Sequence, residues 1–382
     1  MKKENEIPRC KNFTGYKPCY SDHNCWEDGC KDNIPIGTKI LIINLDAMGD
    51  VLMTTAQLPL LKKKFPESTI YWITLPIASP LLFNNPLIDK VFNYNAESIS
   101  ILQNIKFDYV LNVDKSLRSC AILNSTKAEN KLGFGLNEDG KIIPVNKGAY
   151  YNYNLGMDDK LKFKINEKTG QEYLAETFEL DFEKHDYVFE FTDEEKEFID
   201  NYKQEIGISP NDLIVGFNTG CSNLYPNKKM TIEQHQYLIE KLLEKKKYKV
   251  LLFGGPEDTE RNKQIYSKFK GEIINTPTNL GVRKGACFEA LADVIITGDS
   301  FGMHLGIALK KYIIVWFGVS CRTEIELYNR GVKLFDENLE CSPCWKQECP
   351  YNLECIKNID LNRMLEEVNK YFEDINVKRN NK

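Results

Sequence analysis

Strand-length apolar runs, each ending in a short polar turn and followed by a helical pattern, recur along most of this chain. The first run, KILIINL at 39–45, leads through a turn at 48–50 into a helical pattern over 51–64. Continuous apolar runs of this length suit strands that are covered on both faces, as in parallel sheets. Their alternation with helices predicts an α/β fold with helices on both faces of each sheet.

The series occurs twice, which indicates two tandem Rossmann-like domains. A chain of 382 residues also exceeds the size at which one hydrophobic core keeps growing. Further strands are expected at 69–74, 90–92 and 109–113 in the first half, and at 213–218, 248–253, 293–297 and 312–317 in the second. Ligands bind at the carboxyl ends of such strands, so two facing halves predict a site in the cleft between them.

These patterns divide the chain into four parts. We expect a cysteine-rich N-terminal segment at 1–38, one Rossmann-like domain at 39–195, a second at 196–360 that contains a cysteine cluster at 341–355, and a C-terminal helix and tail at 361–382. The net charge of -5 argues against a nucleic-acid binder, which usually has a basic domain. No segment approaches about 18 uncharged apolar residues, and the first residues lack the apolar core of a signal peptide. We therefore expect a cytoplasmic protein, with at most peripheral contact at the inner face of the cytoplasmic membrane.

The turn after the first strand places an acidic side chain where the strand gives way to a helix. Gly49 lets the chain turn tightly there, and Asp50 is placed to face the cleft near the positive end of the helix dipole. Asp50 could be only a helix cap, or it could be a functional carboxylate. The segment alone leaves both interpretations open.

Three further strand ends carry residues suited to a phosphate or a ribose. Thr219, Gly220 and Ser222 could offer backbone N–H groups and hydroxyls to a diphosphate, although such turns are commonly rich in small residues. Glu257 follows another strand and could accept hydrogen bonds from ribose hydroxyls or serve only the turn.

The last of these strand ends opens a helix with Asp299, Ser300, Gly302 and His304. Asp299 and Ser300 could cap the helix or touch the same phosphate, and His304 could be a packed structural residue or a site residue.

The order of these motifs, LDAMGDVLMTT, then GGPED, then DSFGMHLGIAL, resembles the heptosyltransferases, glycosyltransferase family 9, over roughly residues 39–360. The resemblance implies the GT-B architecture, in which two Rossmann-like domains face a cleft. It places the family's catalytic aspartate at Asp50, after Met48 and Gly49 in the acceptor-side turn. It places the donor diphosphate at Asp299, Ser300, Gly302 and His304.

The resemblance also implies an inverting glycosyltransferase that moves a sugar, such as heptose from ADP-heptose, onto a saccharide or lipopolysaccharide-type acceptor. Asp50 would act as general base. Backbone N–H groups would stabilise the leaving diphosphate, so no catalytic metal is expected. This sequence departs from the family where a Lys and a Trp often precede a proline, because it has Asn223-Leu224-Tyr225-Pro226 there. Lys228, Lys229 or another cation must then replace that lysine, or the donor preference differs.

Eight of the 12 cysteines form two groups. The C-terminal group, Cys341, Cys344, Cys349 and Cys355, contains the CxxC pair typical of structural zinc sites. The N-terminal group, Cys10, Cys19, Cys25 and Cys30, is more loosely spaced. In a reducing compartment such groups more often hold a metal than form disulfides. A structural zinc ion or iron–sulfur cluster is one interpretation, and free thiols or regulated disulfides are the other. Because the last helix of a GT-B chain tends to return to the first domain, the two groups could share ligands.

Two rival functions follow from the same features. One keeps the GT-B fold but makes the protein a nucleotide-sugar epimerase or hydrolase, whose turnover needs no acceptor. The other is a metal-binding or redox-sensing scaffold derived from the enzyme, for which the clustered cysteines are the evidence. The intact Asp50 and Asp299 motifs favour the transferase.

Overall fold

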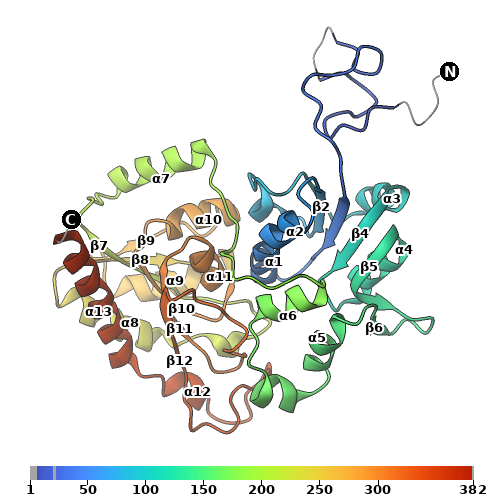
Figure 1. Cartoon of the computed structure of the whole chain (residues 1–382). Helices are drawn as coiled ribbons and strands as arrows, with labels where there is room; N and C mark the ends of the chain where they lie inside the picture. The colour runs from blue at the N-terminus through green and yellow to red at the C-terminus, as the bar shows by residue number, and fades with distance from the viewer. Residues whose placement is uncertain (1–6, 20–22, 381–382) are drawn as a thin grey trace.

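The computed structural model describes residues 7–19 and 23–380 and contains two six-stranded sheets (Figure 1). The strands of the first sheet are β1 (Lys39–Ile43), β2 (Thr69–Thr74), β3 (Lys90–Asn93), β4 (Lys106–Asn112), β5 (Lys127–Leu136) and β6 (Ile142–Pro144). They lie in the order β3-β2-β1-β4-β5-β6, and only β6 runs antiparallel to its neighbour. The helices of this half are α1 (Met48–Thr54), α2 (Leu58–Lys64), α3 (Ala96–Asn104), α4 (Leu117–Ser125), α5 (Ala149–Leu155) and α6 (Gly170–Thr177).

The second sheet repeats this arrangement with parallel strands. Its strands are β7 (Leu213–Asn218), β8 (Tyr248–Phe253), β9 (Ile274–Asn275), β10 (Val294–Gly298), β11 (Tyr312–Trp316) and β12 (Gly331–Leu334), in the order β12-β11-β10-β7-β8-β9. The helices are α7 (Asp193–Glu205), α8 (Ile232–Leu243), α9 (Thr259–Ser267), α10 (Gly281–Glu289), α11 (Phe301–Ala308), α12 (Glu354–Lys357) and α13 (Leu361–Asn380). None of the helices in the described ranges is long and apolar enough to span a bilayer.

Both sheets have the Rossmann strand order 3-2-1-4-5-6 when strands are counted from the start of each half. The order reverses between β1 and β4 in the first half and between β7 and β10 in the second. Ligands bind in the crevice at such a reversal, outside the carboxyl ends of the strands. The segments after these four strands are therefore where a site is expected.

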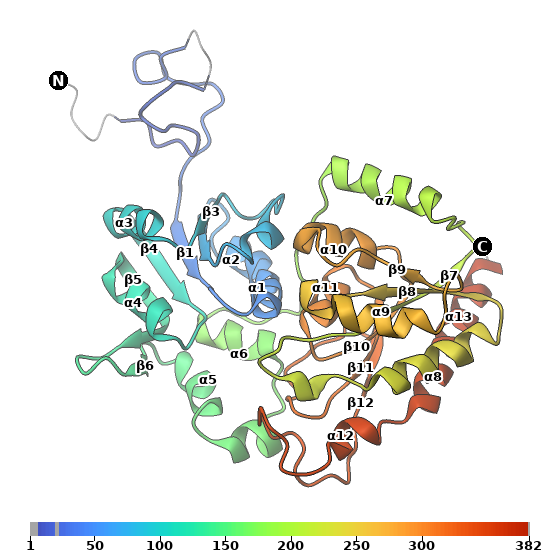
Figure 2. The same cartoon turned by 180° about the vertical axis from the view of Figure 1, so that it is seen from behind.

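Burial explains why these segments became strands. Residues 40–43 of β1 are fully buried because helices cover both faces of the sheet, and β7 is buried in the same way. Figure 2 shows the two sheets side by side, with α1 of the first half next to α11 of the second. The prediction of two Rossmann-like domains in a GT-B architecture is confirmed. The boundary between residues 195 and 196 stays a proposal, and it falls within α7.

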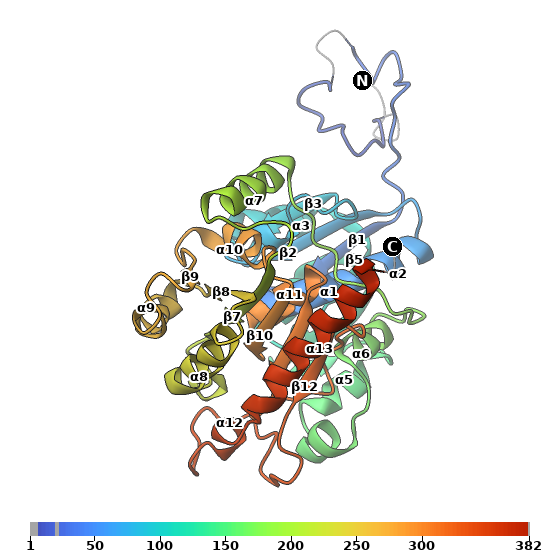
Figure 3. The same ribbon diagram turned by 90° about the vertical axis from the view of Figure 1, so that its left-hand side faces the viewer.

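Some expected details were wrong. The turn expected at 48–50 lies inside α1, and the helical pattern of 51–64 is divided by a 3₁₀ turn at Thr55–Gln57. The last helix packs on the second domain, where Met364, Val368 and Phe372 belong to the core beneath the second sheet (Figure 3). The two cysteine groups lie at opposite ends of the molecule (Figure 2). One lies in the N-terminal lobe, which is residues 7–19 and 23–38, and the other lies beside α12, so they share no ligands.

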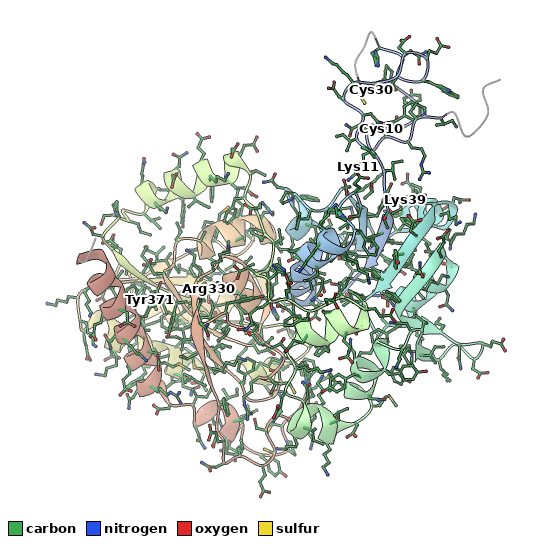
Figure 4. The ribbon with its side chains drawn as sticks, in the orientation of Figure 1. Cys10, Lys11, Cys30, Lys39, Arg330 and Tyr371 are labelled. Carbon is green, nitrogen blue, oxygen red and sulfur yellow. The ribbon has the colours of Figure 1, made fainter. Side chains whose placement is uncertain are left out.

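The N-terminal lobe stands out from the first domain (Figure 4). Lys11 fastens its base, because the Nζ atom lies 2.9 Å from the Ser68 carbonyl oxygen and 2.6 Å from Asp89 Oδ1. The described part of the lobe has a single isolated bridge, between Cys10 and Pro35, and no helix or strand.

Candidate functional site

Asp50 lies in the first turn of α1, after the loop that follows β1. Its carboxylate accepts a hydrogen bond from the Ala47 N–H at 3.2 Å, so it does take part in capping the helix. Asp114 follows β4 and holds the same loop, since it accepts the Leu45 N–H and the Asn44 side-chain amide, the latter at 2.7 Å. Because β1 and β4 are neighbours at the reversal of strand order, Asp114 can fix the loop that carries Asp50.

Burial gives Asp50 a proton affinity suited to a base. It raises the pKa of Asp50 to about 6, with a further contribution from the negative charges of Glu324 and Asp299. The Ala47 N–H and Lys228 act in the opposite direction. Burial likewise raises the pKa of Asp114 to about 7. A carboxylate whose pKa lies close to the working pH can accept a proton from a substrate hydroxyl.

Gly49 brings the two domains into contact at Asp50. A Cβ atom on Gly49 would lie 2.5 Å from the Cδ2 atom of His304, which is on α11 of the second domain. The residue is therefore small because α1 approaches α11 closely, and not because a tight turn needs it. Met48 is half-buried and packs against the main hydrophobic core.

Asp299 follows β10 and pairs with Lys228, whose Nζ atom lies 2.7 Å from its Oδ2 atom. Burial alone would raise the pKa of Asp299, but the charge of Lys228 helps to lower it below its ordinary value. Asp299 is therefore ionised. Its partner Lys228 stays a candidate for the cation that replaces the family's lysine. Lys229 lies 3.8 Å from Asp258 instead.

Ser300 and Gly302 form the start of α11 and lie against β7. The Ser300 hydroxyl lies 3.3 Å from the side-chain amide of Asn218 and makes no capping hydrogen bond. A Cβ atom on Gly302 would overlap the same amide. His304 is buried and neutral, because burial lowers its pKa to about 4, and its ring stacks on Tyr187 at 6.1 Å between centroids. The structure thus places Asp50 near Asp299, Ser300 and His304 across the contact of α1 with α11, and the roles of these residues stay predictions.

The side chains of the loop after β7 are less available than those at the start of α11 to contact a diphosphate. The Thr219 hydroxyl is buried and donates to Asn262, so it is already engaged. Gly220 leaves room for Asp258, whose carboxylate would overlap a Cβ atom there. Ser222 and Glu257 are both exposed. Any diphosphate contact by this loop would come from its backbone.

Sequence reasoning missed several charged residues around this cleft. Glu324 follows β11, and its carboxylate lies 3.6 Å from the Nζ atom of Lys162 in the first domain. Burial raises the pKa of Glu324 and lowers that of the nearby Lys115 to about 8. Glu324 and Lys162 are 162 positions apart and belong to no recognised motif, so nothing in the sequence could have paired them.

Each cysteine group lines one cavity. Cys341, Cys344, Cys349 and Cys355 surround one beside α12, and Cys10, Cys19, Cys25 and Cys30 surround another in the N-terminal lobe together with His23. All twelve cysteines are free thiols. Within residues 7–19 and 23–380, no three Cys, His, Asp or Glu side chains are arranged so that they could hold a metal ion.

Known proteins match this chain over most of its length. Lipopolysaccharide heptosyltransferase 1 of Campylobacter coli is 24% identical over 74% of this chain and 84% of its own length. The solved structure of E. coli ADP-heptose LPS heptosyltransferase II has a TM-score of 0.65 at 18% identity and covers 87% of this chain and 98% of its own. The dodecameric iron-containing heptosyltransferase TibC of enterotoxigenic E. coli, in complex with ADP-D-β-D-heptose, has a TM-score of 0.51 at 11% identity over 88% of this chain and 77% of its own. The structural likenesses show a shared fold.

The sequence model of glycosyltransferase family 9 (heptosyltransferase) matches residues 98–354, which include the donor-side motifs and three of the four C-terminal cysteines. This match covers more than half of the chain and agrees with the fold. The protein is therefore a glycosyltransferase that belongs to glycosyltransferase family 9.

Proposed function

We propose that this enzyme transfers heptose from ADP-heptose to a saccharide or lipopolysaccharide-type acceptor with inversion at the anomeric carbon. The observation that carries the proposal is the contact of the Asp50 turn with the donor-side helix, where Gly49 meets His304. It puts a carboxylate with a pKa of about 6 beside the helix start that would receive the donor. The curated relatives are heptosyltransferases of lipopolysaccharide synthesis, which supports this donor and acceptor class.

In this proposal Asp50 removes the proton from an acceptor hydroxyl as its oxygen attacks the anomeric carbon. A new carbon–oxygen bond forms, and the bond from that carbon to the diphosphate oxygen breaks. The electron pair leaves with the nucleoside diphosphate, and the proton stays on Asp50. Attack from the side opposite the leaving group inverts the anomeric configuration.

The leaving diphosphate gains negative charge as the bond breaks. Lys228 would stabilise this charge, because its ammonium group is already held within the cleft by Asp299. The N–H groups at the start of α11, after Ser300, and those of Thr219 to Ser222 would add to it. Glu257 would accept hydrogen bonds from the ribose. These groups act without a catalytic metal.

Release of nucleoside diphosphate from a panel of activated sugars, with and without acceptor extract, tests the function. We expect acceptor-dependent release from ADP-heptose, and a fall of about 10²-fold or more in Asp50→Asn. Asp139→Asn, in the exposed turn between β5 and β6, is the matched control and should match the wild type. Release without an acceptor would point to a hydrolase, and full activity in Asp50→Asn would overturn the assignment of the base.

We also propose that the enzyme works at the inner face of the cytoplasmic membrane as a peripheral protein, because a glycolipid acceptor of this class would be met there. The two cysteine groups are proposed as structural sites for zinc or an iron–sulfur cluster. Four thiols line each cavity, and a metal would have to draw them closer than they stand now. Metal analysis of the purified protein tests this, and the absence of bound zinc and iron would leave the thiols free.

A further inference from the structure

The loop that carries the C-terminal cysteines is tied to the active cleft. The N–H groups of Cys344 and Trp345 both donate to the Val319 carbonyl oxygen, at 3.0 and 2.9 Å. The Ser342 hydroxyl donates to the Gly318 carbonyl oxygen at 2.6 Å. The Asn227 side chain, next to Lys228, donates to the Lys346 carbonyl oxygen at 2.7 Å. These bonds fix the loop against both the end of β11 and the donor-side segment.

Trp345, at the centre of this loop, receives one lysine from each domain. The Nζ atoms of Lys228 and Lys162 each lie 4.8 Å from the centroid of its ring. Tyr225 meets the same ring edge-on, with centroids 5.2 Å apart. The face of an indole ring attracts ammonium groups, so the ring helps to hold two like charges near each other.

Each of these two lysines pairs with a carboxylate of the proposed site. Lys228 binds Asp299, and Lys162 binds Glu324. The charges of Asp299, Glu324 and Lys228 all act on Asp50. The Trp345 Nε1–H group is buried and has no hydrogen-bond partner among the described residues.

We propose that Trp345 is a positioning residue for the donor diphosphate, and that the four cysteines around its loop hold it in place. The ring sets the positions of Lys228 and Lys162. This inference rests on the proposed function, because the diphosphate is the donor's. It gives the C-terminal cysteine group a task in the transfer reaction in addition to stabilising the fold.

The cysteines are placed to transmit such an effect. Cys344 is the residue before Trp345, and Cys355 packs so closely under Gly318 that a Cβ atom there would lie 2.8 Å from its sulfur. Gly318 accepts the hydrogen bond from Ser342 in the same loop. A change at any of the four cysteines would therefore move the loop that carries the indole ring.

The first test compares Trp345→Leu with Trp345→Phe in steady-state transfer, varying the concentration of ADP-heptose. Losing two cation–π contacts should raise the donor KM of Trp345→Leu roughly five- to thirtyfold and change kcat much less. Trp345→Phe keeps an aromatic face and should lie within about threefold of the wild type. Trp26→Leu, in the N-terminal lobe, is the control. A wild-type KM in Trp345→Leu, or equal damage in Trp345→Phe, would overturn the proposal.

The second test asks whether the cysteines act through Trp345. As a single change, Cys349→Ser should raise the KM for ADP-heptose. Combined with Trp345→Leu it should raise this KM no further, because both changes disturb the same contact. Cys287→Ala, on α10, should leave the KM unchanged. Additive effects of Cys349→Ser and Trp345→Leu would remove the cysteines from the proposal.

Titration with ADP by calorimetry separates this inference from the proposed function. If no sugar donor is turned over but Trp345→Leu still weakens ADP binding, the transfer function fails and the positioning role stands. If ADP-heptose is turned over and both the KM and the ADP affinity are unchanged in Trp345→Leu, the transfer function stands and the positioning role fails.

Discussion

Asp50 combines two demands at the scale of a single residue: its side chain is half-buried, which favours the neutral form, and yet it must be ionised to act as a base. Burial raises its pKa to about 6, above the ordinary value of 3.8. The folded protein therefore binds this proton more tightly than the unfolded chain does. Asp50 contributes stability below about pH 4, and that contribution is lost as the pH rises through about 6.

We predict that Asp50→Asn is inactive but more stable than the wild type near neutral pH. Asparagine can still accept the Ala47 N–H, and it carries no buried charge. The difference in the free energy of unfolding should be close to zero at about pH 4 and grow to about 2–3 kcal/mol by about pH 7. Urea unfolding of both proteins across this range measures it.

The same titration should appear in catalysis. In the wild type kcat should fall as the pH drops below about 6, because protonated Asp50 cannot accept a second proton. The exposed control Asp139→Asn should follow the wild type in both stability and activity. A stability difference that does not change with pH would mean that the pKa of Asp50 is not raised in the folded protein.

At the scale of elements, the crossing of α1 and α11 decides whether Asp50 meets the donor side. Gly49 allows this crossing, and His304 fills the space where a side chain would lie. We predict that Gly49→Ala costs about 1–3 kcal/mol of stability, because His304 must shift within a packed interior. It should also reduce transfer at least tenfold, because the shift separates Asp50 from α11.

Gly285 offers a matched control in another helix. It lies inside α10, and a Cβ atom there would meet nothing within 4 Å. Gly285→Ala should therefore stabilise the protein by about 0.5–1 kcal/mol and leave transfer intact. Thermal unfolding and transfer assays on both variants check the pair. If Gly49→Ala also stabilises the protein, the close contact with His304 is not the reason for this glycine.

The elements that could be predicted from the sequence are those buried on both faces. Residues 40–43 and 213–217 carry no polar side chain, and the strands at 39–43 and 213–218 are confirmed. β5 was missed because it begins with the polar residues KAEN, which lie near the edge of the sheet, where water replaces a covering helix. The two-residue strand β9 and helix α10, with two glycines and two basic residues, also carry too weak a pattern.

The part of the candidate site that could be predicted from the sequence consists of the motifs at strand ends. Asp50 follows β1, and Asp299 and His304 follow β10, and each of these strands lies next to a reversal of strand order in its own sheet. The pairing of Lys162 with Glu324 depends on how two domains dock, which no local pattern encodes. Trp345 was passed over because the cysteines around it suggested a metal site, whereas its own neighbours come from distant parts of the chain.

At the scale of the whole molecule, Arg283 joins the two domains and the segment between them. It lies on α10 of the second half and binds Glu195 of α7, with its Nε atom 2.8 Å from Oε1. Its guanidinium group also donates to the carbonyl oxygens of Pro80 and Phe83 in the first half, at 3.4 and 3.3 Å. It reaches the Glu190 carbonyl oxygen at 2.8 Å. The relative position of the domains depends on this one side chain more than on any exposed ion pair.

We therefore predict that Arg283→Ala lowers stability by about 1–3 kcal/mol, because it leaves the half-buried Glu195 without its charged partner. The loss should also uncouple the domains, so that calorimetry resolves two unfolding transitions where the wild type shows one. Lys196→Ala, next to Glu195 on α7, breaks only an exposed pair with Asp193 and should cost about 0.5 kcal/mol or less. If Arg283→Ala unfolds in a single transition with a similarly small loss, the domains are held together by their apolar contacts, and Arg283 is not the residue that couples them.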